Sequence, residues 1–148
     1  MMTNKLYHFA ATLILGFLFS ATAAVAQQAA GTLWSVDFVR TKDGQYENYL
    51  KTVEKNWAVA RREMQQQEHI ISYKVLAVPP DSLKEWNVML MTEYASQKDI
   101  DEQEKYFQTI FADKKIFPSG LFTIAGLKSA DLREIKFSKV FRMSPDAK

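Results

Sequence analysis

The fold follows from one stretch, Leu33-Trp34-Ser35-Val36-Asp37-Phe38-Val39-Arg40, and from the change of period that comes after it. Side chains of an extended chain alternate between two faces, and one face of this stretch carries Trp34, Val36 and Phe38. The other face carries Leu33, Ser35, Asp37 and Val39. Such alternation among aromatic and β-branched residues predicts a β-strand over residues 33–40.

A long helix is predicted over residues 45–67, directly after a turn at residues 41–44. Its apolar residues recur at spacings of three and four, which is typical of one buried stripe on a helix. This stripe consists of Tyr46, Tyr49, Leu50, Val53, Trp57, Ala60 and Met64. Arg61 and Arg62 fall beside the stripe, where they either meet an anionic ligand or, as we favour, lie on a solvated face.

Two strands and a second helix are predicted next. Residues 70–78 are rich in strand-forming residues and end at Pro79-Pro80, which cannot donate hydrogen bonds to a sheet. Residues 86–94 alternate again, with Trp86, Val88, Leu90, Thr92 and Tyr94 on one face and Asn87, Met89, Met91 and Glu93 on the other. Ser96 and Asp99 resemble a capping box that begins a helix, whose buried residues would be Ile100, Phe107, Ile110 and Phe111.

The last third of the chain contains a break and a final strand. Residues 116–120 end the helix, and residues 121–130 are expected to form a short helix or a loop at the sheet edge. Residues 132–142 alternate, which predicts a fourth strand with Arg133, Ile135, Phe137, Lys139 and Phe141 on one face.

The predicted order is βαββαβ, the α+β arrangement called ferredoxin-like, in which a four-stranded antiparallel sheet carries two helices on one face. The first and third strands offer apolar residues on both faces, because Leu33, Val39, Met89 and Met91 lie opposite the sets led by Trp34 and Trp86. A sheet with two partly apolar faces needs cover on both. We expect the second cover to be another copy of the same sheet, in a homodimer.

The chain resembles the dimeric α/β-barrel superfamily, which includes antibiotic-biosynthesis monooxygenase-like, EthD-like and NIPSNAP-like families. The resemblance rests on residues 33–40, on Gly44-Gln45-Tyr46-Glu47-Asn48-Tyr49-Leu50 and on residues 86–94. It implies a pair of facing sheets, with a pocket in each subunit. Some members are cofactor-free oxygenases, and others degrade haem with a helix histidine and a first-strand asparagine. Here Ser35 or Asp37 stands in that strand region and His69 follows the helix, so haem degradation is not expected.

Residues 1–26 are predicted to be a cleaved signal peptide. Lys5 precedes an uncharged apolar run from Phe9 to Phe19, and Ala24-Val25-Ala26 follows as a cleavage site. The run is shorter than the ~20 residues that a membrane span requires. The mature protein would be residues 27–148, a single domain in the periplasm or outside the cell, with no stable membrane insertion.

Composition excludes several kinds of site. The chain has no cysteine, and after loss of His8 its one histidine is His69. A zinc site built from several His and Cys residues is therefore excluded within one chain, so no metal and no cofactor is expected. The net charge of +2 gives no indication of nucleic-acid binding.

Eight residues are candidates for a functional site. If the first and third strands are neighbours, Ser35, Asp37, Asn87 and Glu93 would converge on the more polar face. Asp37, Glu93 or His69 would then serve as a catalytic base, or would be solvated or structural. Trp34, Tyr73, Asn87 and Tyr94 would line a ligand pocket or belong to the core.

Two functions remain open from the sequence. The first is an exported homodimer that binds a small apolar or aromatic ligand without chemistry. The second is a cofactor-free monooxygenase-like or isomerase-like enzyme that uses a buried carboxylate or His69 as its base. We favour the first, because no motif of catalytic specificity is present.

Overall fold

The structure, a computed structural model, describes residues 31–80 and 85–143. Thr32–Met143 form one compact unit. The expected signal peptide 1–26 lies outside the described residues, so its cleavage and the export of the protein stay predictions. Within the described ranges, no helix combines the length and the apolar character that a membrane crossing requires.

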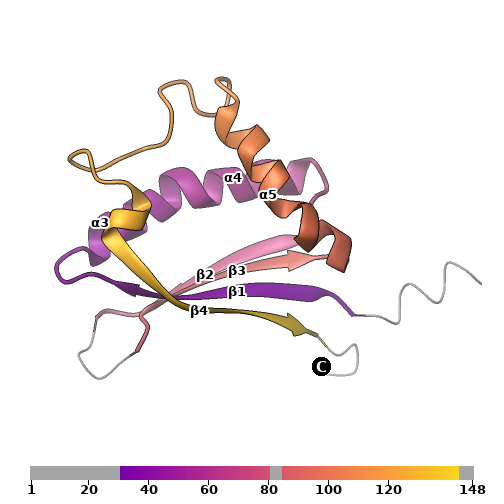
Figure 1. Cartoon of the computed structure of the whole chain (residues 1–148), viewed down its shortest axis with the longest axis horizontal. Helices are drawn as coiled ribbons and strands as arrows, with labels where there is room; N and C mark the ends of the chain where they lie inside the picture. Colours follow the sequence, from indigo (N-terminus) through magenta and orange to yellow (C-terminus); the bar gives the residue numbers. More distant parts are fainter. Residues whose placement is uncertain (1–30, 81–84, 144–148) are drawn as a thin grey trace, which may run out of the picture. The chain divides into compact units, whose positions relative to one another are not determined.

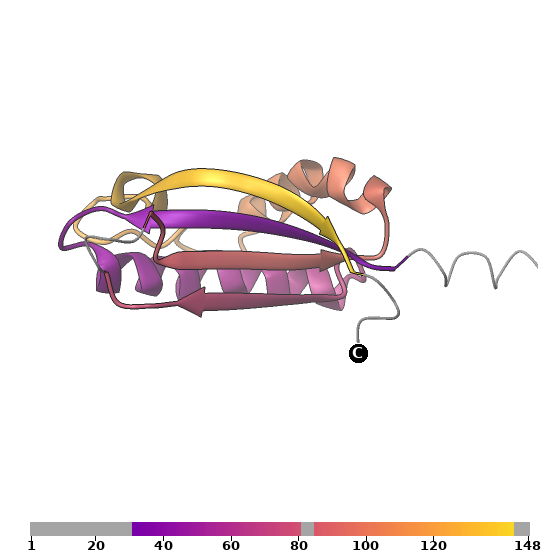
Figure 2. The same ribbon diagram turned by 90° about the horizontal axis from the view of Figure 1, so that it is seen from below.

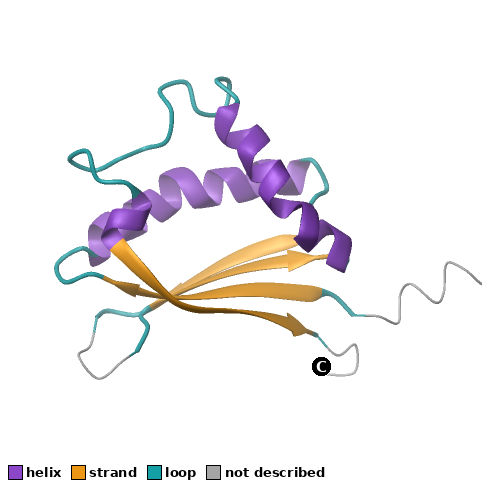
Figure 3. Ribbon diagram, in the orientation of Figure 1, coloured by secondary structure: helices purple, strands orange, loops and turns teal. Residues whose placement is uncertain are grey.

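The described chain forms one four-stranded sheet with helices on one face (Figures 1 and 3). The strand order is β2-β3-β1-β4, and every neighbouring pair is antiparallel. In chain order the elements are β1 (Leu33–Thr41), α3 (Tyr46–Thr52), η1 (Val53–Trp57), α4 (Ala58–Gln66), β2 (Ser72–Ala77), β3 (Val88–Tyr94), α5 (Gln97–Ala112), η2 (Ser129–Leu132) and β4 (Arg133–Arg142). This order and topology confirm the predicted ferredoxin-like fold.

The register between β1 and β3 decides which side chains share a face. Leu33 pairs with Tyr94 and Val39 pairs with Val88, and these residues belong to the buried core under the helices. On the opposite face Val36 pairs with Met91 and Trp34 pairs with Glu93. The expected grouping of the two strand faces was therefore wrong, because the Trp34 face of β1 lies with the Met89 and Met91 face of β3.

A β-bulge changes the alternation of β4. Phe38 pairs with Phe137, but the next residue, Val39, pairs with Ile135, so Lys136 is the additional residue. A bulge inserts one additional residue into one strand. Residues two positions apart across the bulge therefore point to opposite faces of the sheet, instead of to the same face. Ile135 and Arg133 therefore lie on the face opposite Phe137, which corrects the expected set for this strand.

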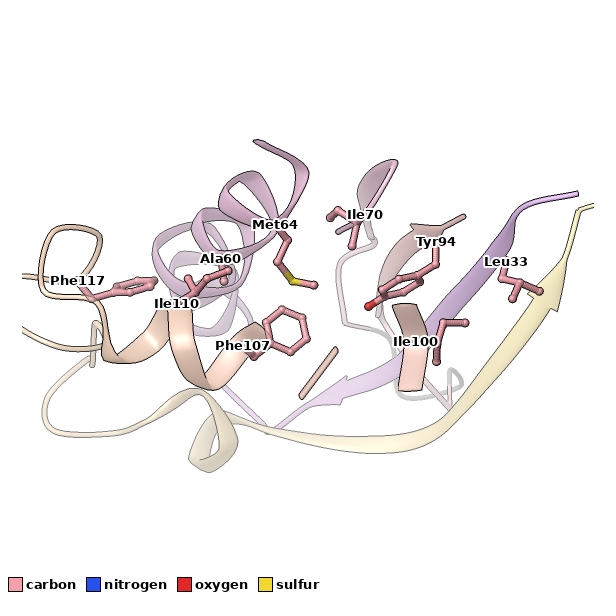
Figure 4. Close-up of a cluster of buried hydrophobic side chains, with 9 residues drawn as sticks. All are labelled: Leu33, Ala60, Met64, Ile70, Tyr94, Ile100, Phe107, Ile110 and Phe117. Atoms are coloured by element: carbon pink, nitrogen blue, oxygen red, sulfur yellow. The ribbon is translucent and has the colours of Figure 1, made fainter. Parts of the chain in front are cut away.

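Two clusters of buried residues join the helices to the sheet. The larger cluster packs α4 against α5 and the ends of β1 and β3 (Figure 4); it comprises Leu33, Ala60, Met64, Ile70, Tyr94, Ile100, Phe107, Ile110 and Phe117. In the close-up, Met64 and Phe107 point toward one another between the two helices. The smaller cluster lies under α3 and comprises Val39, Tyr49, Val53, Val88, Leu90 and Leu132. As expected, Ser96 caps α5, its Oγ accepting from the backbone N–H of Asp99 at 3.3 Å.

The first long helix runs from Tyr46 to Gln66 but contains a π-helical turn, η1, in its middle. A π-turn holds an additional residue, so the residues after it are rotated relative to a regular α-helix. Asn56 lies buried in this turn, and Arg61 is buried beside Ala60 and Met64. The favoured expectation of a solvated Arg61 was therefore wrong.

Asn56 is hydrogen-bonded to the segment after α5. The sequence predicted that residues 121–130 form either a short helix or a loop. Its Nδ2 donates to the carbonyl of Phe122 and its Oδ1 accepts from the Phe122 N–H, both at 2.8 Å. Between α5 and η2 the chain is irregular, with one bridge between Ile124 and Leu127. The segment is thus a loop. Phe117 packs at its start in the larger cluster, and Asn56 satisfies both backbone groups of Phe122.

Asn56→Ala should lower the free energy of unfolding by about 1–3 kcal/mol, because both backbone groups of Phe122 lose their partner. Urea unfolding at 25 °C measures this change, and hydrogen exchange should show faster exchange of the Phe122 amide. The matched control is Asn48→Ala in the same helix, which removes only a side-chain bond to Gln45. It should change the free energy by less than about 0.5 kcal/mol; equal losses in the two variants would contradict the role of Asn56.

Candidate functional site

One face of the sheet has no helix on it, and we call it the open face. Seen from below, the four strands lie in front and the helices behind them (Figure 2). No described element covers this side. Following the strand pairing, the open face carries eight apolar residues and four polar ones. The apolar residues are Trp34, Val36, Phe38, Leu76, Met89, Met91, Phe137 and Phe141, and the polar ones are Ser72, Lys74, Glu93 and Lys139. It is therefore predominantly apolar and aromatic.

The open face contains a groove of about 440 Å³. It is lined by Trp34, Val36, Phe38, Lys74, Met89, Met91, Phe141, Arg142 and Met143. Three methionines, three aromatic residues and Val36 provide the apolar part of this surface, and the cationic side chains of Lys74 and Arg142 complete it. The Lys74 ammonium lies 5.2 Å from the centre of the Trp34 ring, a cation–π distance.

Aromatic contacts extend the groove lining along β1. The Phe38 ring stacks on Phe137 at 4.3 Å between ring centres and meets Trp86 edge-on at 5.3 Å. These contacts join β1 to β4 and to the residues before β3. Because aromatic rings have few rotatable bonds, such a set forms a preorganised surface rather than an adaptable one.

The structure does not bring the three expected bases together. Asp37 lies on the helix side of β1, where Ser138 donates a hydrogen bond to its carboxylate. Glu93 lies on the open face and accepts from the hydroxyls of Thr32 at 2.7 Å and Ser72 at 2.6 Å. His69, beyond α4, stacks on Tyr106 with ring centres 3.6 Å apart.

Of the four expected ligand residues, only Trp34 lines the groove. Asn87 is a buried structural clamp, since its Oδ1 accepts from the Thr41 N–H at 2.9 Å and its Nδ2 donates to the Thr41 hydroxyl at 2.7 Å. Tyr94 is buried on the helix side and donates to Gln103 at 2.8 Å. Tyr73 meets Trp57 edge-on at 5.7 Å, also on the helix side.

Arg61 is the residue for which the favoured prediction, a solvated position, differs most from the structure. Its side chain is 9% exposed, its Cζ lies 4.5 Å from the Trp57 ring centre and 3.9 Å from that of Phe107, and its Nε donates to Thr92 at 3.3 Å. Burial lowers the pKa of its guanidinium to about 10. A signal existed in the spacing, since Arg61 follows Trp57 by four residues and precedes Met64 by three.

Burial also affects two tyrosines on the helix side. It raises the pKa of Tyr49 to about 12, with a smaller opposing effect from Arg133. Burial raises the pKa of Tyr94 as well, and Arg61 opposes this shift. Among the described residues, no cluster of His, Asp and Glu is suited to hold a metal ion.

The fold is similar to that of solved bacterial proteins without an assigned function. A NIPSNAP family protein of unknown function from Agrobacterium tumefaciens is 18% identical over 78% of this chain and 90% of that chain, with a TM-score of 0.53. A second crystal structure from that species gives 19% identity, 76% and 97% coverage and a TM-score of 0.52. A dimeric protein of unknown function and ferredoxin-like fold from Bacteroides fragilis gives 13% identity, 76% and 97% coverage and a TM-score of 0.46.

The likeness to the two Agrobacterium tumefaciens structures shows the fold alone. At such low identities it says nothing more about this chain. No family model matches the chain, and no curated protein matches it either. The function therefore has to be argued from the open face and from the helix side of this chain itself.

Tyr49→Phe should make the stability of the protein less dependent on pH between about pH 10 and pH 12. The pKa of Tyr49 is raised by folding from its ordinary value of 10.0 to about 12. Its contribution is therefore complete below pH 10 and is lost as the pH rises through 12. Urea unfolding at a series of alkaline pH values measures this slope. Tyr46→Phe in the same helix is the matched control, and identical slopes in wild type and Tyr49→Phe would contradict the assignment.

Proposed function

We propose that this protein is an exported homodimer whose two open faces pack on each other and whose grooves bind a small apolar or aromatic molecule. The observation that carries the proposal is the apolar groove of about 440 Å³ on the uncovered face of the sheet. Export rests on the leader-like residues 1–26.

The apolar open face supports the dimer. Phe141 and Leu76 are 44% and 53% exposed there, although both are large apolar side chains. Large apolar side chains exposed in this way are costly in water, and a second sheet packed on the open face would bury both. A twofold pair of facing sheets buries the same patch on both subunits, and this arrangement forms an α/β barrel.

The size and chemistry of the groove support a small ligand. Sites for small molecules occupy about 300–1,000 Å³ and are lined mainly by apolar and aromatic side chains. Trp34 lines the groove although it is only 8% exposed, while Met89 and Met91 are side chains that adapt to irregular shapes. Packing of a second sheet over the groove would exclude water from the bound molecule.

The arrangement favours binding over proton abstraction. A catalytic base must lie within hydrogen-bond distance of the bound molecule. Glu93 shares the open face but does not line the groove, and two hydroxyl groups already donate to its carboxylate. Asp37 lies on the other face of the sheet, and His69 stacks on a tyrosine of α5.

Phe141→Lys should weaken the dimer by about 10- to 100-fold, because it places a charge in an apolar interface. Val140→Lys is the matched control, since Val140 is the adjacent residue on the opposite face of β4 and is 50% exposed. Light scattering at micromolar concentration measures the mass of each variant. A wild-type protein that is a monomer under these conditions would contradict the dimer.

Naphthalene, as a neutral aromatic probe, should raise the melting temperature of the wild-type protein, because a ligand of the folded state stabilises it. Met91→Trp should abolish this shift by filling the groove, whereas Met91→Leu, which conserves the volume, should keep it. Quenching of tryptophan fluorescence gives a second measure of binding. An equal response of the two Met91 variants would show that naphthalene does not occupy the groove.

A further inference from the structure

A buried cation without an ion-pair partner lies on the helix side of the sheet. The guanidinium of Arg61 is enclosed by Trp57 on the first long helix and by Phe107 on α5, and its Nε donates to Thr92 on β3. Within the described ranges, no carboxylate approaches Arg61 to ion-pair distance. A buried charge of this kind is costly unless a partner compensates it.

The terminal amino groups of Arg61 have hydrogen-bonding capacity to spare. A guanidinium has five N–H donors, and Arg61 uses one of them within the described part of the chain. Every fully enclosed polar side-chain atom among the described residues has a partner. Since the terminal amino groups of Arg61 have none, they retain contact with solvent, although the residue as a whole is only 9% exposed.

We propose that Arg61 anchors a second binding site, on the helix side of the sheet, for the carboxylate of a small apolar or aromatic acid. A planar carboxylate accepts two parallel hydrogen bonds from the edge of a guanidinium, which is the strongest form of this contact. Trp57, Phe107 and Tyr73, which contacts Trp57, provide apolar surface beside the bound carboxylate.

The charges around Arg61 favour a singly charged acid over phosphate. The site contains one buried cation, and the negative field of Asp37 already reaches it and opposes the fall of its pKa. A carboxylate of charge −1 balances the guanidinium, whereas a phosphate of charge close to −2 would leave negative charge in a desolvated place. Thr92, which accepts from Arg61, pairs with Ser35, and Ser35 lies on the face of β1 opposite Trp34 and Val36. The site at Arg61 is therefore on the face of the sheet opposite the groove.

The test compares benzoate with its uncharged analogue benzamide and with inorganic phosphate, by thermal unfolding of the purified protein. At about ten times its dissociation constant, benzoate should raise the melting temperature of wild type by about 5 °C. Benzamide and phosphate should leave it unchanged. Arg61→Met, which keeps an apolar stem of similar length, should reduce the benzoate shift to less than about 1 °C, and the exposed neighbouring Arg62→Met should keep the full shift.

Two further measurements keep the result decisive. Met91→Trp, which fills the groove of the open face, should keep the benzoate shift, and this separates the two sites. If Arg61→Met does not fold, the fluorescence of Trp57 beside the guanidinium still reports binding, since benzoate should change the emission of wild type and benzamide should not. The proposal is overturned if benzoate gives no response in wild type, if Arg61→Met and wild type respond alike, or if phosphate alone stabilises the protein.

Discussion

The antiparallel pairing of β1 with β3 is the constraint on which the rest of the structure depends. By placing Leu33 opposite Tyr94 and Val36 opposite Met91, it assigns each side chain of the two central strands to a face. A shift of one residue would send every side chain of one strand to the opposite face. The helices then cover the Tyr94 face, and the Met91 face remains as the open face.

Two elements each contain one additional residue relative to a regular strand or helix: β4 at its bulge and the first long helix at its π-turn. The bulge at Lys136 reverses the alternation within β4, so that Phe137 faces the groove side while Ile135 faces the helix side. The π-turn at Val53–Trp57 rotates the second half of the first helix, so that Asn56 holds the loop and Arg61 lies over the sheet. The bulge is the irregularity that a regular period does not reveal, whereas Arg61 keeps regular helical spacings from Trp57 and Met64.

The periods in the sequence predicted the single elements but not the pairing between them. Periods of two and of three to four residues predicted every strand and both helices, because each reflects burial of one side of a single element. They could not predict which face of β1 shares a side with which face of β3, since that depends on pairing between strands. The position of Arg61 was predicted wrongly because its charge suggested solvent exposure, although its spacing of four residues from Trp57 and three from Met64 puts it beside the buried stripe.

The edges of the sheet explain why its open face, rather than its edge strands, is suited to self-association. The edge strand β4 carries a bulge at Lys136, and both a bulge and a lysine on an edge strand oppose pairing with another chain. The apolar side chains instead gather on the flat of the sheet, where a twofold contact uses the same patch on both partners and then closes. Pairing through edges would leave new edges free and continue into a fibre, whereas pairing through the open face ends at two subunits. The distribution of charge and apolar surface on this one sheet therefore favours a closed dimer over an open assembly.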